Sequence, residues 1–73
     1  MKIKPGTPVV ATYGHNEVTN EPFKFLYEFG YYTDHGCVVY LQGECNMQDS
    51  HAFKLDNVQV ATKEDLERYF WGN

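Results

Sequence analysis

The chain has 73 residues, 42% of them hydrophobic and 22% charged, a composition that excludes a disordered tail and leaves room for one small domain. It contains no apolar run near the roughly 18 residues that a membrane span needs, and residues 1–5 lack the apolar core of a signal peptide. These features predict a single domain over residues 1–73, a cytoplasmic location and no membrane partner.

The net charge of −4 comes entirely from the second half of the chain. Residues 1–33 carry three basic and three acidic side chains, whereas residues 34–73 carry three basic and seven acidic ones. Binding to a phosphate backbone needs clustered Lys and Arg, and this chain has one Arg and no basic run, so nucleic acid is a disfavoured partner. The acidic half predicts a solvated surface. Two more specific alternatives are an acidic patch that attracts a basic partner and a surface that mimics the charge of a nucleic acid.

The chain offers one metal-like set, formed by His35, Cys37, Cys45 and His51. Zinc sites place their ligands in close pairs such as Cys-x-x-Cys, and the two cysteines here have seven residues between them. Two cysteines are also too few for a disulfide-rich scaffold, so we interpret both as reduced thiols. The sequence predicts neither a metal nor another cofactor.

Three catalytic residue types stand in a row at Asp49, Ser50 and His51. Adjacent residues on a strand point to opposite faces, so these three cannot form a proton relay. The sequence has no glycine-rich phosphate loop, and nothing near Cys37 or Cys45 marks a nucleophile. We therefore expect a protein that is not an enzyme and has no catalytic residues.

The first predicted elements are a turn over residues 3–8, a β-branched strand over 9–13 and a polar loop over 14–22. Residues 23–32 then alternate aromatic and mostly polar side chains, which predicts a strand with an aromatic core face. Gly30 marks a bulge or bend in that strand. The stripe predicted to face the core consists of Phe23, Phe25, Tyr27, Phe29 and Tyr31.

Residues 34–36 predict a three-residue hairpin turn, in which Gly36 takes the left-handed conformation, and residues 37–41 return as the partner strand. A second turn region follows over residues 43–49. Residues 50–55 alternate again and place His51, Phe53 and Leu55 on one face. A tight turn over residues 55–57 precedes a short last strand over 58–60.

A helix is predicted over residues 62–71 by the capping-box pattern of Thr62 and Asp65. Leu66 and Phe70, four residues apart, form the stripe expected to be buried, and Gly72 ends the helix. A helix of this length is too short to be stable alone, so it must pack on the sheet.

Two motifs flank the long aromatic strand: Ile3-x-Pro5-Gly6-x-x-Val9 and Phe53-x-Leu55-Asp56-x-Val58-x-Val60. Together with the long loop and the bent hairpin, they resemble the SH3-like small β-barrel superfamily and its Tudor-like relatives over residues 3–61. In such barrels the last strand follows a tight Leu-Asp-x-Val turn. The resemblance implies a fold and carries over no functional residue.

The predicted fold class is therefore mainly β. It is either a small SH3-like barrel or a strongly bent antiparallel sheet of 4–5 strands, over residues 3–61, with a short C-terminal helix over 62–71.

The chain has twelve aromatic side chains, more than the roughly six or seven large rings that so small a core can hold. Exposed Tyr and Trp are typical of interface anchors, and SH3-like barrels bind peptides in aromatic grooves beside the first long loop. The surplus predicts a partner-binding groove, half-burial of these side chains under the helix, or a homodimer face. The groove residues predicted are Tyr13, His15, Tyr32 and Trp71.

These features favour a small non-catalytic protein-binding module that docks on a larger partner. Its size and style resemble those of phage proteins that inhibit or redirect host machinery. The alternatives are an SH3-like or Tudor-like nucleic-acid-binding module, which would stack bases on Tyr and Phe, and an acidic nucleic-acid mimic.

Overall fold

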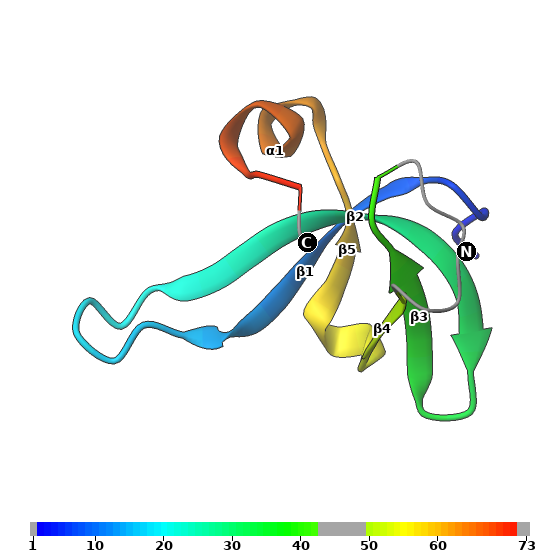
Figure 1. Ribbon diagram of the computed structural model, residues 1–73, viewed down its shortest axis with the longest axis horizontal. Coiled ribbons are helices and arrows are strands. Elements are labelled where there is room, and N and C mark those ends of the chain that lie inside the picture. Colours follow the sequence, from blue (N-terminus) through cyan, green and yellow to red (C-terminus); the bar gives the residue numbers. More distant parts are fainter. Residues whose placement is uncertain (1, 43–49, 72–73) are drawn as a thin grey trace.

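The computed structural model describes residues 2–42 and 50–71, which form one bent antiparallel sheet followed by a short helix (Figure 1). The predicted turn over residues 43–49, Cys45 and Gly72 lie outside the described residues. No helix in the described ranges has the length and apolar character to cross a membrane. The elements are β1 (Pro8–His15), β2 (Pro22–Thr33), β3 (Gly36–Tyr40), β4 (Ser50–Phe53), the 3-10 turn η2 (Leu55–Asn57), β5 (Val58–Val60) and α1 (Lys63–Arg68).

The sheet has the strand order β4-β3-β2-β1-β5. Strands β1 to β4 follow one another as a meander, and β5 returns to pair with β1 at Val9–Ala11. In the described part of the chain β4 and β5 are the two edges, so the sheet bends without closing into a barrel. This confirms the predicted mainly β class in its bent-sheet form.

A bulge at Gly30 bends β2, whose arch spans the molecule (Figure 1). Phe29 lies opposite Val39 and Tyr31 lies opposite Val38, so Gly30 is the extra residue in β2. One extra residue reverses the alternation of the strand. Tyr32 therefore lies on the core side and packs on Phe29 with ring centroids 4.8 Å apart, although it remains 37% exposed; Tyr31 lies on the other face and is 44% exposed.

The predicted aromatic stripe is thus correct in its middle and wrong at both ends. Tyr27 and Phe29 are buried and Phe25 packs against them. Phe23 is exposed because β1 and β2 run past the rest of the sheet there, and Tyr31 is exposed because of the bulge. The buried cluster comprises Val9, Ala11, Tyr27, Phe29, Cys37, Val39 and Val58.

Turns and strand ends differ from the prediction in three places. The loop between β1 and β2 is confined to residues 16–21, and the β2–β3 turn has two residues, because Gly36 already pairs with Thr33. Gly36 has φ +155°, a positive value that L side chains rarely adopt, so a glycine is needed here as predicted; a Cβ would also strike the Phe53 carbonyl. Strand β4 ends at Phe53, so Leu55 belongs to η2 and is exposed.

The helix is shorter than predicted. Thr62 and Asp65 form the expected capping box, but α1 ends at Arg68 with Tyr69 as its C-cap. Leu66 and Phe70 are exposed, so the predicted buried stripe is wrong.

The segment after α1 makes the backbone connection to the sheet. The Leu26 N–H donates to the Phe70 carbonyl at 2.9 Å, and Trp71 forms a parallel bridge with Leu26 on the free edge of β2.

Candidate functional site

The four predicted groove residues have different surroundings. Tyr13 and His15 lie in the second half of β1, Tyr32 lies near the end of β2, and Trp71 follows α1. Tyr32 accepts a hydrogen bond from the Ile3 N–H at 2.8 Å and so fixes the N-terminal segment. Trp71 is half-buried against the edge of β2. Of the four, Tyr13 makes the most ring contacts, and we take it as the centre of the candidate site.

Tyr13 belongs to an aromatic cluster contributed by β1, β2 and β4. Its ring centroid lies 5.0 Å from that of Phe53, 5.8 Å from Phe25, 6.3 Å from Tyr27 and 6.5 Å from His51, each in edge-to-face geometry. Edge-to-face pairs of this spacing are favourable beyond the area that they bury. The bend of the sheet brings β4 onto β1 here, although the two strands are not neighbours in the strand order. The aromatic cluster therefore joins two strands, β1 and β4, that are not paired with each other.

Hydrogen bonds orient the polar ends of three of these rings. The Tyr27 hydroxyl donates to the Tyr13 hydroxyl at 3.0 Å, and the Tyr13 hydroxyl lies 3.3 Å from His51 Nδ1. The Tyr13 hydroxyl therefore has a hydrogen-bonding partner on each side, Tyr27 in β2 and His51 in β4. Burial, and next the hydrogen bond with Tyr13, raise the pKa of Tyr27. Tyr27 thus keeps its proton, and the chain of hydroxyls holds Tyr13 in place.

One side of the aromatic cluster faces solvent. Tyr13 is 45% exposed, whereas Tyr27 beneath it is buried. Phe23, further along the same hairpin, is also exposed. The arrangement offers an apolar contact surface with a polar hydroxyl. Burial also raises the pKa of the Cys37 thiol, which is the opposite of what activates a nucleophile.

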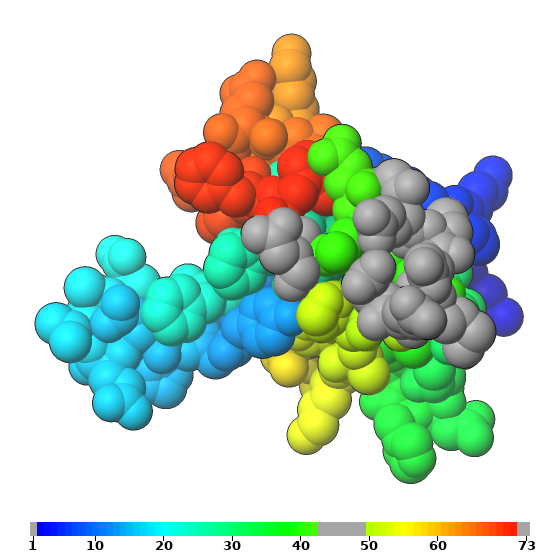
Figure 2. Space-filling view, viewed as in Figure 1, coloured from blue at the N-terminus to red at the C-terminus, as the bar shows by residue number. Residues whose placement is uncertain are grey.

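The β1–β2 hairpin extends this surface well beyond the body of the molecule (Figures 1 and 2). At its end, Asn16 organises the loop: its Oδ1 accepts from Val18 N–H at 2.8 Å and from Thr19 N–H at 3.3 Å. Asn20 has φ +59°, a left-handed conformation that Asn tolerates. The sequence indicated a polar loop here, but neither its ordered turn nor its projection. His15 is exposed near the base of this loop, opposite Pro22.

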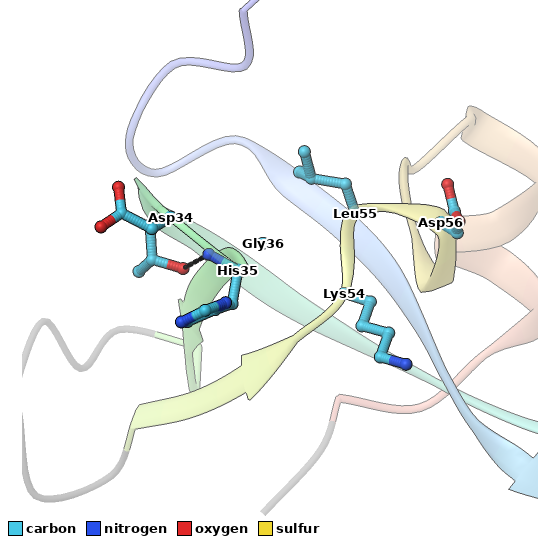
Figure 3. Close-up of a pocket in the computed structure, with 7 residues that line it drawn as sticks. Asp34, His35, Gly36, Lys54, Leu55 and Asp56 are labelled. Atoms are coloured by element: carbon cyan, nitrogen blue, oxygen red, sulfur yellow. Dashed lines mark hydrogen bonds between the residues drawn. The ribbon is translucent and has the colours of Figure 1, made fainter.

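A separate pocket of about 410 Å³ lies between the β2–β3 turn and η2 (Figure 3). Its titratable side chains are those of Asp34, His35, Lys54 and Asp56. Figure 3 shows them pointing away from one another rather than toward a common point. The pocket therefore has the volume for a small molecule without a convergent set of polar groups, and we do not take it as the functional site.

Comparison of the chain with protein-family models, with curated proteins and with solved structures returned no significant match.

Proposed function

We propose that this protein is a small, non-catalytic binding module that docks on a larger protein through the exposed side of the aromatic cluster. Tyr13 is the central contact and His15 lies at the rim. The observation that carries this proposal is a half-exposed Tyr ring held by four ring contacts and two hydroxyl hydrogen bonds.

Pre-organisation is the physical reason to expect binding at Tyr13. Ordering a side chain at an interface costs about 0.5–1.5 kcal/mol, and a ring that is already fixed avoids most of that cost. Tyr also combines a large apolar area with one hydrogen-bonding group, and it is enriched among the residues that dominate interfaces.

We also propose an SH3-like architecture for the sheet. The tight turn η2, with Leu55 and Asp56, leads directly into β5, as the resemblance implies. The projecting β1–β2 hairpin stands beside the aromatic cluster, where such modules bind extended peptides. An extended segment of a partner is therefore the favoured ligand.

The test is affinity capture from a lysate, with and without nuclease, using the wild-type protein and two variants. Tyr13→Ala should remove the captured partner. Tyr31→Ala is the matched control, because Tyr31 is 44% exposed but lies on the other face of the sheet. Circular dichroism must show that both variants remain folded.

Three outcomes would contradict the proposal. Equal loss of capture with both variants would mean that the aromatic cluster is not the contact. Retention by Tyr13→Ala would have the same meaning. Capture that disappears on nuclease treatment would favour nucleic-acid binding instead.

A further inference from the structure

The hairpin loop and the N-terminal segment lie toward opposite ends of the molecule (Figure 1). Their side chains carry opposite charges, and each group stands beside an exposed valine, Val18 or Val60. One end is the loop of the β1–β2 hairpin, and the other is the N-terminal segment beside β5. We name them the acidic tip, formed by Glu17, Val18 and Glu21, and the basic pocket, lined by Lys2, Ile3, Lys4, Thr7 and Val60.

The acidic tip presents an apolar side chain between two carboxylates. Val18 is 94% exposed, and Glu17 and Glu21 are also exposed. The loop is closed by the Asn16 N–H, which donates to the Glu21 carbonyl at 2.7 Å, and by the bonds of the Asn16 side chain. Because these bonds fix the loop before any contact forms, little conformational entropy remains to be lost on binding.

The basic pocket offers the complementary surface. It has a volume of about 290 Å³, roughly twice that of a cavity that holds a benzene ring. Ile3 and the exposed Val60 supply apolar wall, and Lys2 and Lys4 are exposed. The bond from the Ile3 N–H to the Tyr32 hydroxyl fixes the segment that forms one side.

We propose that the acidic tip of one copy of this chain docks in the basic pocket of a second copy, with Val18 in the pocket and the glutamates beside the lysines. A tip and a pocket at opposite ends of one molecule cannot meet each other, so only another copy brings them together. The two surfaces differ, which makes the contact head-to-tail, and it can repeat from copy to copy. A contact this small gives association that is weak, dependent on concentration and weakened by salt.

Sedimentation velocity of the full chain tests the proposal, from about 10 μM to about 1 mM protein. We expect the mean mass of the wild type to rise with concentration without a plateau at the dimer. Raising NaCl from about 0.1 M to about 1 M shortens the Debye length from about 10 Å to about 3 Å and should reduce the association. Val18→Asp, Lys4→Glu and Glu17→Lys should each remain monomeric. Glu67→Lys, a charge reversal on α1, is the matched control and should associate like the wild type.

Two combinations distinguish a head-to-tail contact from other forms of association. Lys4→Glu combined with Glu17→Lys in one chain exchanges one charge pair and should restore association. A mixture of the Val18→Asp and Lys4→Glu proteins should stop at the dimer, because only one intact tip and one intact pocket remain in each pair. A wild type that stays monomeric up to about 1 mM overturns the proposal. So does association that survives both Val18→Asp and Lys4→Glu.

Discussion

Gly30 decides which face of β2 each later ring occupies. A Cβ at this position would lie 2.7 Å from the Val38 carbonyl oxygen and would strike the ring of Tyr40. The glycine therefore allows the bulge, and the bulge turns Tyr32 toward Phe29. A glycine within an alternating strand was sufficient to predict a bulge. It was not sufficient to predict the reversal of Tyr31 and Tyr32, because that depends on how β3 pairs on both sides of it.

Gly30→Ala should lower the free energy of unfolding by about 1–3 kcal/mol, as overpacking in a tight core does. Urea unfolding followed by circular dichroism measures the change. The Tyr40→Ala background supplies the control, because it removes the ring that the new methyl group meets. The two substitutions should then be less than additive, by at least about 0.5 kcal/mol. Full additivity would show that Tyr40 does not confine this position.

At the scale of the element, local sequence determines where α1 begins, and tertiary contacts determine where it ends. The capping box was predictable because Thr62 and Asp65 satisfy each other's backbone N–H groups within one turn. The end of α1 was not, because Phe70 and Trp71 leave the helical path to bond with the edge of β2. The 82% exposure of Phe70 follows from that departure.

Thr62→Ala should loosen α1 and the segment after it while leaving the sheet intact. Loss of an N-cap costs about 1 kcal/mol, and α1 has no buried residue to compensate for it. Amide hydrogen exchange followed by NMR should show faster exchange at Leu66, Tyr69 and Leu26, whose N–H groups bond to Thr62, Asp65 and Phe70 respectively. The amides of Val9 and Ala11 in the sheet serve as the internal control. Equal acceleration at all five would mean that α1 and the sheet open as one unit.

At the scale of the whole molecule, the candidate site arises from contacts between distant strands that no local pattern encodes. Tyr13 and Phe53 are forty residues apart, and their rings meet at 5.0 Å only because β4 bends onto β1. The sequence supplied Tyr13 as a candidate and the number of strands. It could not supply Phe25, Tyr27, His51 and Phe53 as the neighbours of Tyr13, since the curvature sets those contacts.

Two buried groups of the core, Tyr27 and Cys37, should make the whole fold sensitive to alkali. Burial raises the pKa of Tyr27 above its usual value of 10.0, and burial raises that of Cys37 above 9.0. Above these usual values the unfolded chain loses protons that the folded chain retains. The stabilising contribution of both groups is then present at lower pH and is lost as the pH rises, first that of Cys37 above pH 9.0 and then that of Tyr27 above pH 10.0.

Urea unfolding between pH 8 and pH 11 measures this decline in the free energy of unfolding. Two variants show which group causes it. Cys37→Ala should flatten the plot of stability against pH from pH 9.0 upward, and Tyr27→Phe should flatten it from pH 10.0 upward. Slopes are compared rather than absolute stabilities, because Tyr27→Phe also removes the hydrogen bond to Tyr13, at a cost of about 1 kcal/mol at every pH. A Tyr27→Phe curve parallel to that of the wild type above pH 10.0 would mean that Tyr27 ionises as readily folded as unfolded. The hydrogen bond that the Tyr27 hydroxyl donates to Tyr13 would then be lost by ionisation at the same pH as in the unfolded chain, and it would not support Tyr13.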